Sequence, residues 1–173
     1  MRKYIAFLRA INVGGTTIIK MADLRKMFES FGLENVQTYI QTGNVIFDSA
    51  ETSASRLEEQ IERQLEKASG KPIRVYVRTM KEVAALAKEC PFEPGEGETV
   101  YVVILDKKPA KKNIDALIAR QSKADEFAIR GKTAFNQRRD RDTSIFSNNF
   151  IEKVLGVSGT TRNLTTIKKL AEK

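Results

Sequence analysis

The chain of 173 residues contains no histidine, no tryptophan, one cysteine (Cys90) and only four prolines. Without histidine there is no Ser-His-Asp triad, no Cys-His pair and no histidine-ligated metal site. A single thiol excludes an internal disulfide and a cysteine-ligated zinc site. Catalysis would have to use carboxylates, lysine, arginine, hydroxyl groups or Cys90, or a carboxylate-bound Mg²⁺. No matched pair of carboxylates at a useful spacing is visible, so we expect no resident metal or cofactor and favour a binding protein over an enzyme.

Long apolar runs are also missing. No run approaches the roughly 18 apolar residues that a membrane-spanning helix needs. The apolar stretch after Met1 is interrupted by Arg9 and Asn12, which does not match a signal peptide. Together with the lack of cysteine pairs, this predicts a cytoplasmic protein that does not enter membranes.

Charge is unevenly distributed along the chain. The net charge is +8, and residues 1–100 contain as many basic as acidic side chains, so residues 101–173 carry the whole excess. A basic half indicates an anionic partner, either nucleic acid, a phosphorylated small molecule or an acidic protein surface. Alternatively, the lysines at 107, 108, 111 and 112 only keep the start of a helix soluble.

The pattern of apolar residues predicts an α+β protein whose first part is a ferredoxin-like βαββαβ unit. Strands are expected at 3–11, 36–41, 45–48 and 73–78, with helices at 21–31 and 55–69. Strand 3–11 is apolar on both faces, which is typical of a central strand covered on both sides.

The second part of the chain predicts a βαββα-type α+β unit that packs on the first. Its elements are strands at 99–105, 126–130 and 133–136, and helices at 111–120, 147–155 and 164–171. The expected divisions are therefore residues 1–79, a helix with a Pro/Gly/Glu linker at 80–98, and residues 99–173. A diverged copy of the first unit is one interpretation of this order, although no residue-level repeat is visible.

The segment after the first strand is the leading candidate site. It contains Arg9, Asn12, Gly14, Gly15 and Lys20, just before a helix begins. Glycines allow backbone N–H groups to approach an anion, and a helix N-terminus adds a partial positive charge. The segment matches neither common phosphate-loop pattern, and its glycines could serve turn geometry alone.

Two other segments are candidates. The hairpin 39–44 offers Tyr39, Gln41 and Asn44 as stacking and hydrogen-bonding groups, although glycine and asparagine are also ordinary turn residues. Arg162 and Asn163 precede the last helix, where Asn163 can cap the helix and Arg162 can either attract an anion or remain solvated.

The βαββαβ order also occurs in RNA-recognition motifs, which stack bases on aromatic residues of their two central strands. Here the corresponding strand reads Asn44-Val45-Ile46-Phe47 after Thr42-Gly43 and lacks the basic residue and the stacking aromatics. This mode of RNA binding is not supported. Tyr39 and Tyr76 could stack bases, but they lie on the expected edge strands.

Three segments together resemble a known family. They are Arg9-Ala10-Ile11-Asn12-Val13-Gly14-Gly15, Thr38-Tyr39-Ile40-Gln41-Thr42-Gly43-Asn44, and Thr161-Arg162-Asn163. In this order they resemble the bacterial domain-of-unknown-function family 1697. The resemblance implies an α+β fold with a ferredoxin-like first part in a bacterial, cytoplasmic setting, and it brings no activity, cofactor or partner. The family segment usually reads RGINVGG, so Ala10 replaces a glycine, and Leu164 replaces the usual aromatic residue after Arg-Asn.

The leading hypothesis is a protein that binds a phosphate-containing ligand, with nucleic acid favoured over a metabolite. Arg9, Lys20 and Arg162 would contact phosphates, while Asn12, Gln41 and Asn44 would supply hydrogen bonds. One alternative is an enzyme that acts on a small phosphorylated substrate in a cleft between the units, and another is an adaptor that binds an acidic protein. The oligomeric state stays open.

Overall fold

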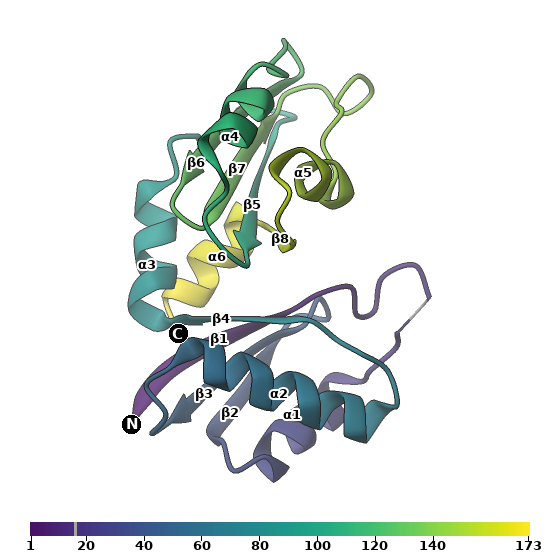
Figure 1. The fold of residues 1–173 in the computed structure, drawn as a ribbon, viewed down its shortest axis with the longest axis vertical. Helices are drawn as coiled ribbons and strands as arrows, with labels where there is room; N and C mark the ends of the chain where they lie inside the picture. Colours follow the sequence, from purple (N-terminus) through teal and green to yellow (C-terminus); the bar gives the residue numbers. More distant parts are fainter. Residues whose placement is uncertain (16) are drawn as a thin grey trace. The chain divides into compact units, whose positions relative to one another are not determined.

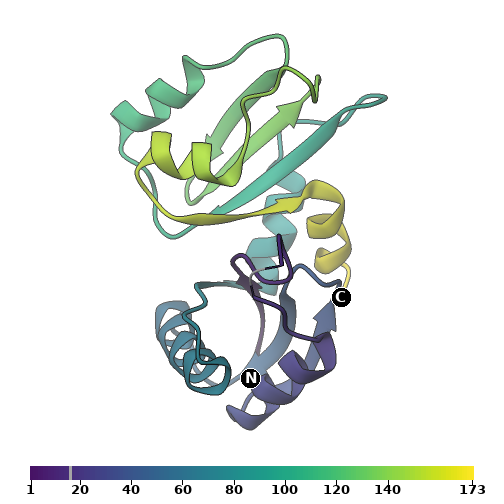
Figure 2. The same cartoon turned by 90° about the vertical axis from the view of Figure 1, so that its right-hand side faces the viewer.

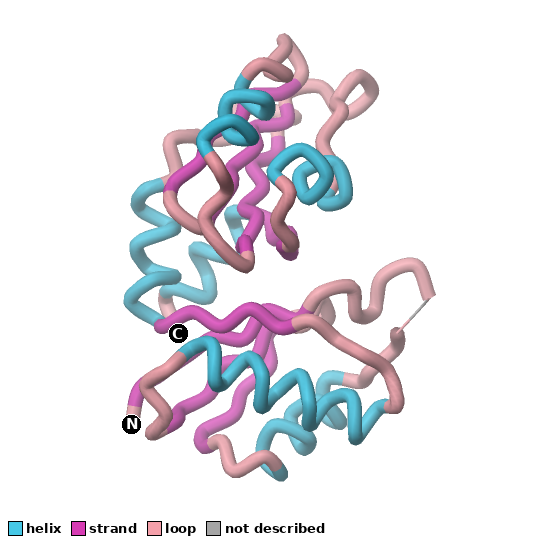
Figure 3. Tube along the Cα trace, viewed as in Figure 1, coloured by secondary structure: helices cyan, strands magenta, loops and turns pink. Residues whose placement is uncertain are grey.

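The computed structural model describes residues 1–15 and 17–173, and Figures 1 and 3 show their strands and helices. In chain order the elements are β1 (Arg2–Leu8), α1 (Met21–Ser30), β2 (Glu34–Tyr39), β3 (Asn44–Ser49), α2 (Ala54–Ser69), β4 (Val75–Thr79), α3 (Met80–Glu89), β5 (Thr99–Leu105), α4 (Lys111–Ile118), β6 (Asp125–Arg130), β7 (Thr133–Arg138), α5 (Asn148–Leu155), β8 (Gly159–Asn163) and α6 (Leu164–Ala171). No helix among these residues is long and apolar enough to cross a membrane.

The first unit, Met1–Val83, has the expected ferredoxin-like arrangement. Its antiparallel sheet has the strand order β2-β3-β1-β4, and α1 and α2 cover one face of it (Figure 1). The i, i+4, i+8 spacing of Leu57, Ile61 and Leu65 places these side chains on one stripe of α2, where they are fully buried. Burial of each such side chain contributes about 1.5–3 kcal/mol. The confirmed fold class thus follows from regular helix and strand periodicity.

Strand β1 is buried on both faces, as its sequence predicts. Tyr4, Ala6 and Leu8 belong to the core beneath α1 and α2, while Ile5 and Phe7 point to the opposite face and are also inaccessible to solvent. Because β1 pairs with β3 on one side and β4 on the other, none of its edges is open. The strand therefore serves as a fixed base for the segment that follows Leu8.

The second unit, Ala84–Lys173, repeats this topology. Its antiparallel sheet has the order β6-β7-β5-β8, with α4 and α5 on one face (Figure 2). Val103, Leu105 and Phe127 from the sheet form a buried core with Leu117 of α4 and Ile151 of α5. Helix α6 packs beside β5 and β8.

The second unit contains one strand that the sequence did not predict. No strand was predicted before the last helix, where Asn163 was expected to cap the helix, but Gly159–Asn163 forms β8, which pairs with β5 from Leu105↔Gly159 to Tyr101↔Asn163. At the edge of a sheet, backbone pairing and β-branched threonines suffice to form a strand without an apolar run. With β8 the unit reads βαββαβ followed by α6, so the two units share one order of elements.

The division between the units falls inside α3, after Val83. The acidic stretch 84–98 therefore belongs to the second unit. Counted by unit, the first carries 13 basic and 10 acidic residues, and the second carries 17 and 12, giving net charges of +3 and +5. Both units are therefore basic, and their net charges differ less than those of residues 1–100 and 101–173.

Candidate functional site

Three connections of the first unit meet at one end of its sheet. The backbone N–H of Leu8 donates to the carbonyl of Gly43 at 2.8 Å, and that of Arg9 donates to the carbonyl of Arg74 at 2.9 Å. These bonds place the described part of the β1–α1 connection (9–15 and 17–20), the β2–β3 turn (40–43) and the α2–β4 connection (70–74) side by side. We call these three segments the first loop end.

Asn12 holds the first loop end together. Its Nδ2 donates to the carbonyls of Ile19 and Gln41, both at 2.9 Å, and its Oδ1 accepts from the N–H of Ile19 at 2.8 Å. Its own N–H donates to the carbonyl of Thr17 at 2.7 Å. Asn12, predicted as a ligand-binding residue, thus has its side-chain groups engaged within the protein. These bonds give the loops a fixed shape before any ligand arrives.

The backbone of the β1–α1 connection repeatedly adopts the left-handed conformation. Ala10, Asn12, Gly14 and Gly15 have φ angles of +56°, +54°, +61° and +72°. A Cβ at Gly14 or Gly15 would meet nothing within 4 Å, so only the backbone conformation favours glycine there. Ala10 adopts the same conformation with a Cβ, which is strained for an L-residue.

The hairpin residues Tyr39 and Asn44 face each other as the last pair of β2 and β3. Asn44 is fully buried, and its Nδ2 donates to the carbonyl of Tyr39 and to Oγ1 of Thr42, both at 3.0 Å. The side chain of Gln41 is exposed at the tip of the turn, and Tyr39 is half-buried on edge strand β2. Asn44 therefore shapes the turn, while Gln41 is the residue of this hairpin that is available to a ligand.

The three segments of the first loop end contain four basic residues, Arg9, Lys20, Lys71 and Arg74, and no carboxylate. A pocket of about 180 Å³ opens among them, and its lining consists of Arg9, Ala10, Thr17, Pro72, Ile73 and Arg74. Two guanidinium groups and a hydroxyl are good donors to an anion. Lys20 is exposed at the N-cap of α1, where its side chain does not cap the helix.

Arg74 is held in place from two sides. Its Nε lies 3.5 Å from Oε1 of Glu62 in α2, and its guanidinium lies 5.7 Å from the centre of the Tyr76 ring. Glu62 also accepts the N–H of Val75 at 2.8 Å, which fixes the carboxylate. Half of the Arg74 side chain remains exposed, so the guanidinium can reach an anion while Glu62 orients it.

Exposed apolar side chains belong to the same segments as these cations. Val13, Ile18 and Ile40 are 58%, 75% and 45% exposed, and all three belong to the first loop end. Exposed large apolar side chains beside cations are typical of a surface that contacts a partner. The first loop end thus combines donors for an anion with apolar surface for an uncharged group.

Arg162 and Asn163 lie in the second unit, at the end of β8. Arg162 is 6% exposed, and its Nη1 donates to Oγ1 of Thr160 at 2.8 Å and to the carbonyl of Thr161 at 2.9 Å. Burial lowers the pKa of Arg162 to about 10. A side chain so removed from solvent is a poor contact for an external phosphate, and we leave it out of the site.

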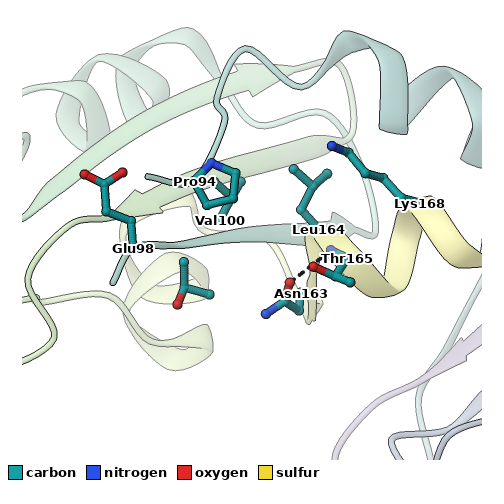
Figure 4. Close-up of a pocket in the computed structure, with 8 residues that line it drawn as sticks. Pro94, Glu98, Val100, Asn163, Leu164, Thr165 and Lys168 are labelled. Carbon is teal, nitrogen blue, oxygen red and sulfur yellow. Dashed lines mark hydrogen bonds between the residues drawn. The ribbon is translucent and has the colours of Figure 1, made fainter. Parts of the chain in front are cut away.

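Asn163 has the capping role that its position predicts. Its Oδ1 accepts the N–H of Thr165 at 2.9 Å at the start of α6 (Figure 4). The hollow drawn there measures about 120 Å³. On its rim, Glu98 accepts the N–H of Gly95 at 2.9 Å and the amide of Gln137 at 2.7 Å. The polar groups of Glu98 and Asn163 are engaged in holding the 93–98 segment and α6, and the lining adds one exposed cation, Lys168.

The sequence analysis missed Arg74 and Lys71 as members of the site, whereas Thr17 lies within the segment that it singled out. Arg74 was assigned to the strand beginning at 73, on the face opposite the helices, whereas β4 begins only at Val75. Its contact with the Arg9 segment depends on the antiparallel pairing of β1 with β4, which joins residues more than 60 positions apart. Arg74 could have been found by placing the first and last predicted strands of this unit beside each other in antiparallel register.

The geometry defines a class of protein: two ferredoxin-like βαββαβ units in tandem, the first with a basic, preshaped loop end. A family model described as a protein of unknown function (DUF1697) matches residues 1–135. The chain belongs to this family, as the three sequence segments implied.

The fold also occurs in a solved structure. The conserved bacterial protein SP0830 from Streptococcus pneumoniae is 21% identical and superposes with a TM-score of 0.75, over 99% of this chain and 97% of that one. At this identity the likeness concerns the fold alone. Among curated proteins, no relative matches this chain.

Proposed function

We propose that the protein binds a phosphate-containing ligand, in the first place a nucleic acid, through the first loop end. The observation that supports this proposal is the pocket between Arg9 and Arg74. It joins two guanidinium groups and the Thr17 hydroxyl in segments that contain no carboxylate. Planar guanidinium groups bind phosphate oxygens in bidentate fashion.

The size of the pocket limits what enters it. Pockets for whole small molecules typically measure about 300–1,000 Å³. A hollow of about 180 Å³ suits a single phosphate group, with the rest of the ligand outside on the surface. The exposed Val13, Ile18 and Ile40 then provide apolar contact for that uncharged part, such as a sugar or a base. A nucleotide within a nucleic acid has this combination of groups.

Binding is favoured over catalysis by the composition of the pocket lining. Among the described residues that line it, there is no carboxylate or lysine that could act as a general base. Arginine stays protonated at neutral pH and serves as a donor only. The groups in this pocket are therefore suited to holding a phosphate.

The test uses a double substitution, Arg9→Met with Arg74→Met, which keeps the apolar stems and removes both charges. The control is Lys26→Met with Arg63→Met, which removes two charges from exposed helix positions of the same unit. Fluorescence polarisation with labelled 12-nucleotide single-stranded RNA and DNA measures affinity at 50 and 150 mM salt. We expect the site variant to bind at least about tenfold more weakly, and its log–log salt slope to fall by about 1.4, which is 0.7 for each lost contact.

Equal losses in the two variants would locate the binding elsewhere. Absence of binding by the unaltered protein at low salt, together with absence of binding to inorganic phosphate and nucleotides in calorimetry, would refute the proposal.

A further inference from the structure

The second unit presents a loop end built like the first. The N–H of Leu105 donates to the carbonyl of Lys132 at 2.9 Å, as Leu8 does to Gly43 in the first unit. The N–H of Asp106 donates to the carbonyl of Ser158 at 2.9 Å, as Arg9 does to Arg74. The β5–α4 connection (106–110), the β6–β7 turn (131–132) and the α5–β8 connection (156–158) therefore meet at one end of the second sheet.

This end is rich in exposed cations. Those on its segments and on the immediately adjoining ends of β6 and α4 are Lys107, Lys108, Lys111, Lys112, Arg130 and Lys132. We call this group of six residues the second loop end. Among the described residues, the nearby carboxylates are three: Asp106 begins the β5–α4 connection, Asp115 pairs with Lys111 at 3.0 Å, and Glu152 accepts the N–H of Gly159 at 3.2 Å. Lys107, Lys108, Lys112 and Lys132 form no ion pair within the part of the chain that the structure describes.

The placement of two of these lysines works against the stability of the fold. Lys111 and Lys112 occupy the first turn of α4, which has no acidic residue and no side-chain cap. Cations at a helix N-terminus meet the positive end of the helix dipole, where acidic residues are favoured. Solubility does not require lysine at this position, since glutamate would keep the helix start soluble and would also interact favourably with the positive end of the helix dipole. This reduces the weight of the solubility explanation for the lysines at 107, 108, 111 and 112.

The chemistry of the second loop end fits phosphates better than an acidic protein. The large apolar side chains that are exposed among the described residues are Met1, Val13, Ile18, Ile40, Ile118 and Ile145, and none belongs to this group. Protein interfaces are enriched in aromatic residues and depleted of lysine. Contacts to a nucleic-acid backbone, in contrast, come mainly from lysine and arginine and need no apolar surface.

We propose that the second loop end binds the phosphate backbone of a nucleic acid. It is a separate surface from the pocket of the first unit, and it rests on the proposed function only in the choice of nucleic acid as the partner. Lysine contacts of this kind carry no sequence information, so the second loop end adds affinity rather than specificity.

The test reverses charges at this end with Lys107→Glu, Lys112→Glu and Lys132→Glu in the full chain. The matched control is Arg120→Glu, Lys123→Glu and Arg141→Glu, which changes the net charge by the same amount. These residues lie at the opposite end of the same sheet, where Asp125 of β6 is the strand-register partner of Arg138 in β7. All six side chains are exposed, and glutamate at position 112 suits the helix start, so the fold should survive. A triple Lys→Gln variant at 107, 112 and 132 provides a second, milder version.

Fluorescence polarisation with a labelled 24-base-pair duplex, from 50 to 200 mM salt, gives the readout. We expect the Lys→Glu variant at the second loop end to bind at least about tenfold more weakly at 100 mM salt, and its log–log slope to fall by about 2–3. The Lys→Gln variant should show the same change of slope. The control should stay within about threefold of the unaltered protein.

Three results would overturn the inference. Equal losses in the second-loop-end and control variants would mean that net charge alone drives binding. Displacement of the duplex by polyglutamate at the same charge concentration as unlabelled DNA would indicate an acidic protein as the partner. Failure of the unaltered protein to bind the duplex at 50 mM salt would exclude the backbone contact. The Arg9→Met, Arg74→Met variant separates the two proposals. If only this variant loses affinity for nucleic acid, the first loop end alone is the binding surface; if only the lysine variants lose affinity, the second loop end alone is the binding surface.

Discussion

Replacing Ala10 by glycine should stabilise the first unit. Ala10 is exposed and has a φ angle of +56°, a conformation that costs an L-residue about 1–2 kcal/mol. Glycine removes this cost but adds about 0.4–1 kcal/mol of conformational freedom to the unfolded chain. The difference between these ranges is about 0–1.6 kcal/mol with a central value of about 0.8 kcal/mol, which corresponds to a rise of about 3–6 °C in Tm for a unit of this size.

The control is the same chemical change in a helix of the same unit. Ala22 is exposed in α1, where glycine costs about 0.5–1 kcal/mol. The urea concentration at the midpoint of unfolding, followed by far-UV circular dichroism, should therefore rise for Ala10→Gly and fall for Ala22→Gly. If Ala10→Gly lowered stability as Ala22→Gly does, the assigned strain at Ala10 would be refuted.

Three further changes test the first loop end and the 93–98 segment. Gly43→Ala should cost about 1–3 kcal/mol more than Gly32→Ala in the same urea assay, because both have φ near +83° but only Gly43 would place a Cβ 2.8 Å from the buried Ile11 side chain; equal costs would contradict this. Asn12→Asp should cost about 2–3 kcal/mol and weaken binding of the RNA probe, since aspartate cannot donate to the two carbonyls that Asn12 joins; unchanged stability would show that these bonds matter little. The N–H of Gly95 and then the amide of Gln137 lower the pKa of Glu98 below its usual 4.5, so the ionised form favours the folded state. Glu98→Gln should therefore be less stable than the unaltered protein at pH 7, and the difference should shrink as pH falls below 4.5 and vanish once the carboxyl group of the folded protein is protonated; a difference that persists at low pH would rule out this cause.

Much of the fold was predictable because its elements follow simple periodicities. Helix α2 shows a regular apolar stripe, and β1 shows the doubly apolar pattern of a central strand. Strand β8 was missed because an edge strand can be polar: Gly159–Asn163 is held by backbone pairing with β5, and no pattern of side chains records that pairing. The duplication was one interpretation of the predicted order of elements, and β8 supplies the strand that this order lacked.

The candidate site was only partly predictable, for a related reason. Sequence reasoning found Arg9, Asn12 and Asn44 because their residue types are typical of turns and anion sites. It could not tell a ligand contact from a structural hydrogen bond, and Asn12 and Asn44 make structural ones. It also could not tell that Arg162 is buried, because solvent exposure depends on packing across the whole unit.

The position of β1 at the centre of its sheet has a consequence for synthesis of the chain. β1, the strand of its unit that is synthesised first, carries Ile5 and Phe7 on one face and Leu8 on the other, and its register partners in β3 and β4 follow 37–75 residues later. At about 5–20 residues per second, the strand remains without its full set of partners for several seconds. The second unit repeats the delay, since β5 pairs with β8 close to the end of the chain. Strand-binding chaperones would therefore meet the nascent protein at two separate times, each ending when the last strand of a unit emerges.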